Sequence, residues 1–101
     1  MKPFFVYMLR CSDGSFYIGH TDDLEKRFFE HQTGVCESYT VERRPVTLVF
    51  SEQCQTRYEA LSLERQLKGW SRAKKQALVE GDFQKLKELS RSSASKAKGV
   101  R

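Results

Sequence analysis

Five polar side chains in the sequence have types that could support acid–base and anion chemistry. They are Tyr7, Tyr17, Arg27, His31 and Glu64. A phenol can move a proton to or from a bound water, and the planar fork of an arginine can hold two oxygens of an anion. A carboxylate can bind a hard divalent ion such as Mg²⁺, which keeps most of its waters and meets phosphate oxygens. If these groups come together in the fold, they are suitable parts for phosphodiester hydrolysis.

The chain as a whole favours one small domain. Its 101 residues, 39% of them hydrophobic, suit a single globular core. No apolar run approaches the ~20 residues of a membrane helix, and a charge comes too early for a signal peptide, so we expect a cytoplasmic protein without membrane contact. The net charge of +5 favours a polyanionic partner such as nucleic acid. Cys11, Cys36 and Cys54 form no CxxC pair, which argues against a zinc site or a disulfide framework.

The hydrophobic pattern predicts an α+β fold in which helices pack on a small antiparallel or mixed sheet. Strands are expected over 4–11, 16–20 and 46–54, and helices over about 22–33, 57–68, 72–81 and 83–89. Asp22 with Glu25, and Thr56 with Glu59, form patterns typical of a capping box at a helix start.

The end of the sequence differs in composition from the rest. Residues 90–101 contain no large apolar side chain except Val100 and cannot bury themselves. We therefore expect a folded domain over 1–89 and a flexible basic tail over 90–101. The lysines and arginines of that tail would attract nucleic acid non-specifically, with an affinity that falls as salt rises.

The turn between the first two strands decides whether the tyrosines can cooperate. A two-residue loop, Asp13-Gly14, would put Tyr7 and Tyr17 on opposite faces of the hairpin. A three-residue loop with Gly14 left-handed in a G1 bulge puts both on one face. We expect the bulged loop, because only that loop brings the phenols together. It sets Gly19 opposite Tyr7, where the missing side chain leaves space for a ligand or for backbone. Alternatively, the two tyrosines only pack their rings and bond their hydroxyls locally.

Charged residues lie on or beside the apolar faces of two predicted helices. Arg27 borders the apolar stripe of the first helix, and His31, one turn later, faces the same way. Glu64 lies inside the stripe that Ala60 and Leu67 define on the second helix. Because a buried carboxylate needs a cation, Glu64 should meet either Arg27, in an internal salt bridge, or a divalent metal ion.

Basic residues beside an aromatic one indicate a surface for nucleic acid. The expected binding residues are Arg43, Arg44, Lys68, Trp70, Arg72, Lys74 and Lys75, together with Gly19 and His20 on the second strand. A base stacked on Trp70, with phosphate contacts from the lysines, would suit a partly unpaired strand. The alternative is a core tryptophan at a helix junction with solvated lysines around it. The sequence contains no recognition-helix or zinc-finger pattern, which favours structure-specific or weakly specific binding.

Two segments of the sequence resemble the signatures of the GIY-YIG nuclease superfamily. The first is "VYMLR…FYIGHTDDLEKRFFEH", in which Phe5-Val6-Tyr7 and Tyr17-Ile18-Gly19 stand for the two halves of the motif. The second is "ALSLERQLKGWSRAKK", which places the metal-binding glutamate at Glu64. The resemblance covers roughly residues 3–80 and is to the short, stand-alone bacterial members. It implies a three-stranded antiparallel sheet flanked by helices, and DNA hydrolysis with one divalent metal ion, Mg²⁺ or Mn²⁺.

The resemblance also implies a role for each matching residue. Tyr7 would be the general base or the phenol that orients the attacking water, and Tyr17 a partner that could exchange that role. Arg27 would stabilise the transition-state phosphate and Glu64 would bind the metal. His31 would support a phenol or the phosphate by hydrogen bonding.

The sequence departs from the family pattern at three points. Phe5 replaces the first glycine of the motif, His20 stands where relatives frequently have lysine, and the chain contains no asparagine to match a late one in some relatives. We expect a metal-dependent DNA endonuclease that acts in DNA repair or processing. The alternatives are a nucleic-acid-binding module of the same fold without turnover and an RNA-processing nuclease.

Overall fold

A computed structural model describes residues 2–35 and 39–90 of the chain. Cys36 and the expected tail from residue 91 onward lie outside the described residues. The chain forms two compact units, Met1–Lys68 and Gly69–Arg101. Within the described part, no helix combines the length and the apolar character needed to cross a membrane.

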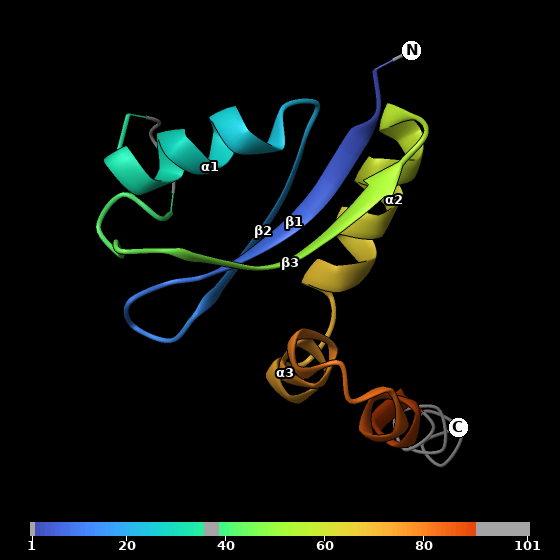
Figure 1. Ribbon diagram of the computed structural model, residues 1–101. Helices are drawn as coiled ribbons and strands as arrows, with labels where there is room; N and C mark the ends of the chain where they lie inside the picture. Colours follow the sequence, from blue (N-terminus) through green and yellow to red (C-terminus); the bar gives the residue numbers. More distant parts are fainter. Residues whose placement is uncertain (1, 36–38, 91–101) are drawn as a thin grey trace. The chain divides into compact units, whose positions relative to one another are not determined.

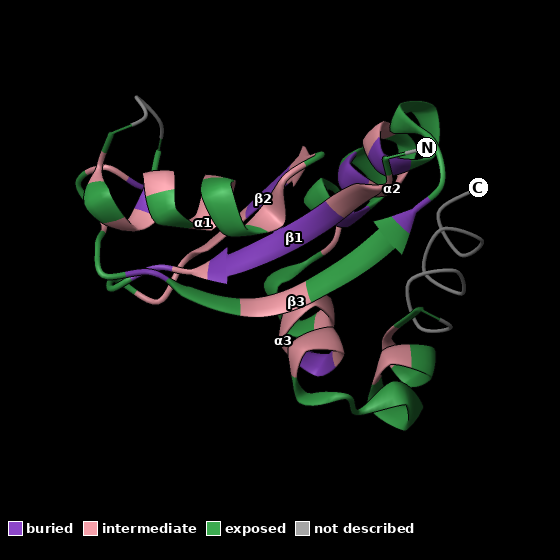
Figure 2. Ribbon diagram, turned by 45° about the horizontal axis from the view of Figure 1, so that its top comes forward, coloured by how far each residue is buried: buried purple, intermediate pink, exposed green. Residues whose placement is uncertain are grey.

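The first unit is a three-stranded antiparallel sheet with a helix on each face (Figure 1). Strand β1 (Phe4–Arg10) lies between β2 (Phe16–Thr21) and β3 (Thr47–Cys54), in the order β2-β1-β3. Helix α1 (Leu24–Thr33) follows β2, and α2 (Arg57–Lys68) follows β3. Figure 2 shows that the central strand β1 is buried along most of its length, whereas much of β3 is exposed. The predicted α+β arrangement is confirmed.

The β1–β2 hairpin has the predicted bulged turn. The Gly14 N–H donates to the Cys11 carbonyl at 2.9 Å, and the Cys11 N–H donates to the Ser15 carbonyl at 2.8 Å. Gly14 has φ +85°, a left-handed conformation that glycine adopts without steric cost. The resulting register pairs Tyr7 with Gly19 and Leu9 with Tyr17. Both tyrosines therefore lie on the same face of the sheet, as the three-residue loop requires.

The two faces of the sheet carry different packing. On the α1 face, buried side chains of β1 and the loops contact aromatic and leucine side chains of β2 and α1; this cluster is Tyr7, Leu9, Cys11, Val46, Tyr17, Leu24 and Phe28. The alternate residues Val6, Met8 and Ile18 are buried on the face that α2 covers, where Ala60 and Leu67 are also buried. Cys11 and Cys54 are free and buried, and burial raises the pKa of both thiols.

Side chains at the helix termini explain where the first unit's helices begin. The N-cap of α1 is Asp23, whose carboxylate accepts from the Lys26 N–H at 3.1 Å, and not the expected Asp22. Thr21 accepts from the Asp23 N–H at 3.1 Å, which turns the chain one residue later than the pattern indicated. Thr56 caps α2 as predicted, because its hydroxyl accepts from the Glu59 N–H at 3.1 Å.

The second unit contains two short helices. Helix α3 (Arg72–Glu80) is capped by Ser71, whose hydroxyl accepts from the Lys74 N–H at 3.2 Å, and it ends at a left-handed Gly81. A further helix over 83–90 begins after Asp82, which accepts from the Lys85 N–H at 3.0 Å. Both helices, and the serine and aspartate caps, match the predicted elements.

Candidate active site

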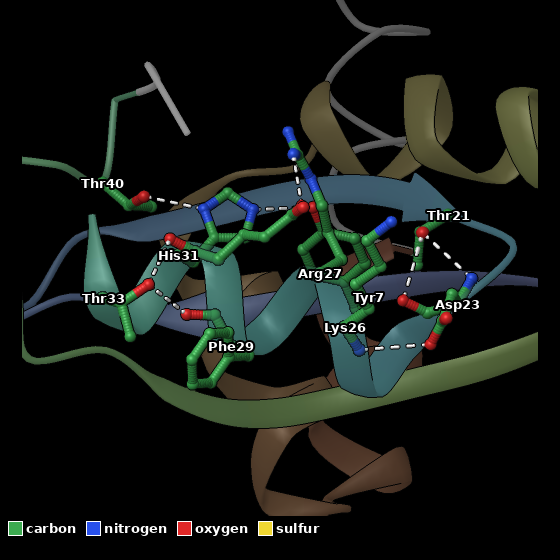
Figure 3. Close-up of polar contacts among 10 residues, drawn as sticks. Tyr7, Thr21, Asp23, Lys26, Arg27, Phe29, His31, Thr33 and Thr40 are labelled. Atoms are coloured by element: carbon green, nitrogen blue, oxygen red, sulfur yellow. Dashed lines mark hydrogen bonds and ion pairs between the residues drawn. The ribbon is translucent and has the colours of Figure 1, made fainter. Parts of the chain in front are cut away.

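A buried chain of hydrogen bonds connects Tyr7, His31 and Thr40. The Tyr7 hydroxyl lies 2.9 Å from His31 Nε2, and the Thr40 hydroxyl lies 2.7 Å from His31 Nδ1. Tyr7 is 2% exposed, and His31 and Thr40 are fully buried. Figure 3 shows the His31 imidazole between the two hydroxyls. This direct contact agrees with the expectation that His31 supports a phenol by hydrogen bonding.

His31 is neutral at physiological pH. Burial lowers its pKa, the Arg27 guanidinium lowers it further, and the Glu30 carboxylate partly opposes both, so that the pKa lies at about 4. A neutral imidazole has one N–H donor and one acceptor nitrogen. Each of its two hydroxyl neighbours can donate or accept, so both nitrogens are satisfied.

Tyr17 packs against the same histidine. The centroid of the Tyr17 ring lies 4.9 Å from that of His31 and 6.3 Å from that of Tyr7. On its other side Tyr17 stacks with Tyr39 at 6.4 Å, and the Arg43 guanidinium lies 3.8 Å from the centroid of the Tyr39 ring. Two phenols from β1 and β2 thus meet one imidazole from α1, as the hairpin register predicted.

Gly19 allows the Tyr7 phenol to lie flat across the hairpin. A Cβ at position 19 would lie 2.6 Å from the Tyr7 hydroxyl oxygen. The space opposite Tyr7 that we expected for a ligand or for backbone is therefore filled by the phenol of Tyr7 itself. This corrects the sequence-based interpretation of that glycine, although its position opposite Tyr7 is as predicted.

Arg27 lies beside a polar cleft of about 520 Å³. Its guanidinium donates to Glu30 Oε1 at 3.1 Å, and the side chain is 33% exposed. The lining of the cleft includes His20 at the end of β2, Lys26 and Arg27 on α1, and Arg57 at the start of α2. The carboxylates of Asp22, Asp23 and Glu30 line the same cleft, so an oxyanion there would meet both cationic and acidic side chains.

Glu64 is buried on α2. Its carboxylate pairs with His20 and Lys68, and not with Arg27 as we considered. His20 Nδ1 donates to Glu64 Oε1 at 2.6 Å, and the Lys68 ammonium lies 2.8 Å from Oε2. Burial raises the pKa of Glu64, but the hydrogen bonds and charges of Lys68 and His20 outweigh it and leave the pKa below its ordinary value. The salt bridge to Arg27 that we considered is wrong, because Lys68 and His20 take that place.

The expected site residues form two groups. Tyr7, Tyr17 and His31 contact one another on the α1 face, while His20, Glu64 and Lys68 form an ion-paired group toward α2. His20 contacts Glu64 and also lines the cleft beside Arg27. His20 therefore connects the Glu64 carboxylate with the cleft beside Arg27.

The sequence did not identify Thr40 as a partner of His31. Thr40 lies in the segment between α1 and β3, which has no periodicity, so spacing gives no sign of its contact. The fold places it through main-chain contacts: the Arg43 N–H donates to the Thr40 carbonyl at 2.9 Å, and the Ser12 N–H donates to the Arg43 carbonyl at 2.8 Å. The partnership of Glu64 with Lys68 had a sequence signal, since an acid four residues before a lysine on a helix forms an ion pair.

The expected nucleic-acid-binding residues lie in different surroundings. The Arg43 guanidinium donates to the Tyr39 carbonyl and to Asp13, and Arg44 donates to the Val41 carbonyl. These bonds hold the two arginines against the loop, which limits their reach toward a phosphate. Their expected role stays a prediction.

In the second unit, Trp70 lies beside basic residues as expected. The Lys74 ammonium is 4.9 Å from the centroid of the half-buried Trp70 ring. Arg72 is exposed, and Lys75 is half-buried. Whether these residues contact nucleic acid stays a prediction.

The residues fit a metal site of the single-carboxylate kind. No group of three or more His, Cys, Asp or Glu side chains gathers for a metal among residues 2–35 and 39–90. Mg²⁺ does not require such a cage, because it keeps several waters and takes one or two carboxylates with substrate phosphates. Glu64 supplies one carboxylate held in place by His20, and the Lys68 ammonium on its other oxygen belongs to a side chain that is 54% exposed.

The family model for the GIY-YIG catalytic domain matches residues 3–77. The UPF0213 protein SSP2268 of Staphylococcus saprophyticus is 43% identical over 79 residues, which cover 78% of this chain and 96% of that protein. A UPF0213 protein of Bacillus pumilus is 43% identical over 76 residues, 75% of this chain and 78% of its own length. The chain therefore belongs to the GIY-YIG family and has a nuclease-type fold.

Two solution NMR structures have similar folds. The UPF0213 protein BH0048 from Bacillus halodurans has 38% sequence identity and a TM-score of 0.51, with 77% of this chain and 83% of that chain covered. Protein EF2693 from E. faecalis has 36% identity and a TM-score of 0.57, with coverage of 82% and 88%. These similarities confirm the expected family and fold, and the UPF0213 names state no activity.

Proposed function

We propose that the protein is a metal-dependent endonuclease that hydrolyses DNA phosphodiester bonds. The observation that carries the proposal is the contact of Tyr7, Tyr17 and His31, which three different elements bring together at the positions of the family motif. A phenol held by a neutral histidine is suited to take the proton of an attacking water.

The other site residues supply binding and charge. Arg27 lines the cleft and can hold two phosphate oxygens as negative charge grows in the transition state. Glu64 would hold Mg²⁺ or Mn²⁺, and such an ion polarises a phosphoryl oxygen and lowers the pKa of bound water. His20 orients the Glu64 carboxylate by its hydrogen bond and faces the cleft with Arg27. Tyr17, whose ring packs against His31, would be a partner that could exchange the role of Tyr7.

Basic residues in each of the two units would contact the nucleic acid. His20, Lys68 and the groups near Trp70 favour a weakly specific or structure-specific mode, because they reach phosphates and a stacked base more than base edges. A role in DNA repair or processing and a cytoplasmic location belong to the same proposal. They follow from the expected substrate and from the sequence.

A second function, nucleic-acid binding without turnover, is favoured by the pairing at Glu64. Lys68 and His20 occupy both carboxylate oxygens, and the chain has no asparagine to supply the late family residue. The presence of the tyrosine–histidine contact weighs against this alternative, since binding alone does not require it.

A cleavage panel separates these functions. Single-stranded, nicked, flapped and branched DNA, and a matched RNA, would be incubated with the full chain and Mg²⁺ or Mn²⁺. We expect cut DNA with the wild type and at least a hundredfold slower cutting with Tyr7→Phe. Tight binding of DNA without products under every condition would replace the nuclease proposal with the binding module, and cleavage of the RNA alone would assign an RNA-processing nuclease.

A further inference from the structure

The His31 imidazole is held at both nitrogens by hydroxyl groups from separate parts of the fold. Tyr7 comes from the central strand, and Thr40 from the segment before β3. All three side chains are excluded from solvent, so exchange of these hydrogen bonds for water is costly. Figure 3 shows Thr40 and Tyr7 on opposite sides of the ring.

A neutral His31 imidazole carries one N–H proton, either on Nδ1 or on Nε2. The nitrogen that carries it decides whether Tyr7 accepts or donates the hydrogen bond between them. In the first arrangement Thr40 donates to Nδ1, and the Nε2–H donates to the phenol oxygen of Tyr7. In the second, Tyr7 donates to Nε2, and the Nδ1–H donates to Thr40. Only the first arrangement directs a donor at the phenol oxygen, where it stabilises a phenolate.

The charge state of His31 favours the first arrangement for catalysis. The second arrangement would use Tyr7 as a donor and would require the histidine to accept its proton during the reaction. A histidine with a pKa of about 4 accepts protons poorly. A neutral imidazole is, however, a competent hydrogen-bond donor to a developing negative charge.

The segment that carries Thr40 is fixed by contacts to the rest of the first unit. The Gln32 side chain forms two hydrogen bonds with the backbone of Val46, at 2.8 and 2.9 Å. Arg43 is hydrogen-bonded to Asp13 at the hairpin tip. The Thr40 hydroxyl is therefore held in place before any substrate binds, as preorganisation of a supporting group requires.

We propose that Thr40 is a positioning residue whose hydroxyl donates to His31 Nδ1, places the imidazole proton on Nε2, and thereby makes the Tyr7 phenol a stronger acid. The effect of Thr40 on the cleavage rate rests on the proposed nuclease function. Its effects on the His31 tautomer and on the acidity of Tyr7 do not depend on that function. The Tyr7 phenolate would accept a proton from water as the water oxygen bonds to phosphorus and the leaving oxygen departs. The leaving oxygen takes a proton from solvent, and Tyr7 returns its own to solvent.

The proposal is tested by NMR on the full chain, whose two histidines make assignment simple. Nitrogen-15 shifts and two-bond couplings report the His31 tautomer, and carbon-13 shifts of labelled tyrosine report the ionisation of Tyr7. We expect the Nε2–H tautomer in the wild type. Thr40→Val should lower the acid dissociation constant of the Tyr7 phenol by about tenfold, and Thr40→Ser should restore it.

The matched control is Thr33→Val on α1, because the Thr33 hydroxyl bonds the Phe29 carbonyl at 2.8 Å and has no part in the chain through His31. It should leave both NMR readouts unchanged. Among residues 2–35 and 39–90, the charged groups that act on His31 include Arg27 and Glu30 on its own helix, and Tyr7 and Tyr17 face it from the sheet, so these residues stay unaltered in all variants.

Two results would overturn the assignment of Thr40. One is an Nδ1–H tautomer in the wild type, which also decides the question if Thr40→Val does not fold. The other is an unchanged Tyr7 titration in a folded Thr40→Val protein. If no protein in the series cuts DNA, the proposed nuclease function fails, but the tautomer and the titration still decide the role of Thr40. With cleavage present, the pH–rate profile of Thr40→Val should move to higher pH, and Thr40→Ser should reverse the change.

Discussion

The Cβ that Gly19 lacks would lie 2.6 Å from the hydroxyl oxygen of Tyr7 and 2.8 Å from the ring carbon that bears it. Real side chains do not approach so closely, so a larger residue at position 19 must displace the phenol. Tyr7 is 2% exposed and has little room to move. The glycine of the second half-motif thus determines where the Tyr7 phenol of the first half-motif lies.

Gly19→Ala should therefore destabilise the protein and remove activity together. Displacement of Tyr7 would break its 2.9 Å hydrogen bond to His31 and force the core to adjust, at a cost of about 1–3 kcal/mol in the free energy of unfolding. Urea denaturation and cleavage of the best DNA in the panel measure the two effects. In the Tyr7→Ala background the clashing atoms are absent, so Gly19→Ala should add little further loss of stability. An equal cost in both backgrounds would exclude the clash as the cause.

Local rules predicted most of this fold from the sequence. The hairpin register was predicted from the requirement that Tyr7 and Tyr17 share a face, because Gly14 suits a two-residue or a three-residue loop. In the structure Gly14 is left-handed, closes the three-residue loop and places Tyr7 opposite Gly19. The burial of Glu64 follows from helical periodicity, since it occupies the apolar stripe with Ala60 and Leu67. The periodicity rule depends only on neighbours along one helix, whereas the choice of turn depended on the expected cooperation of the two tyrosines.

The parts that could not be predicted depend on distant segments. Thr40 meets His31 because the segment after α1 folds back, and no periodic pattern encodes that path. The sequence did not show that Arg27 is not the partner of Glu64, because this depends on how α1 and α2 pack on the sheet. In the structure, His20 on β2 and Lys68 on α2 hold the two carboxylate oxygens of Glu64. The exact N-cap, Asp23 instead of Asp22, depended on a hydrogen bond that the Asp23 N–H donates to the Thr21 hydroxyl.

Arg27→Ala should slow cleavage by roughly 10²–10³-fold, the range for loss of one group that stabilises transition-state charge. Its ion pair with Glu30 is a third exposed, so the stability of the fold should change little. The measurement is single-turnover cleavage with thermal denaturation alongside. Arg65→Ala, an exposed arginine in the last turn of α2, is the control and should cut at the wild-type rate. Wild-type cleavage by Arg27→Ala would remove the arginine from the proposed mechanism.

Glu64→Ala should abolish metal-dependent cleavage while DNA binding persists. The carboxylate is the expected metal ligand, and its loss leaves the basic surface intact or slightly more positive. Mn²⁺ affinity measured by water-proton relaxation should fall, and fluorescence anisotropy should still report DNA binding. Glu52→Ala, an exposed acid on β3, tests whether any lost carboxylate has this effect. Retained Mn²⁺ binding in Glu64→Ala would place the metal elsewhere.

His31 should make the stability of the fold depend on pH in the acid range. Its pKa is 6.5 in the unfolded chain and about 4 in the folded protein, so between these values the unfolded chain binds the extra proton. Stability from this residue is fully present above pH 6.5 and is lost as the pH falls toward 4. At pH 5 the loss amounts to about 2 kcal/mol relative to neutral pH.

Urea denaturation of the wild type and of His31→Gln at pH 7 and pH 5 measures the difference, because glutamine does not titrate. The wild type should lose about 2 kcal/mol more than His31→Gln over this interval. Equal losses would mean that His31 is protonated in the folded state near its ordinary pKa, and the neutral imidazole on which the site depends would be wrong.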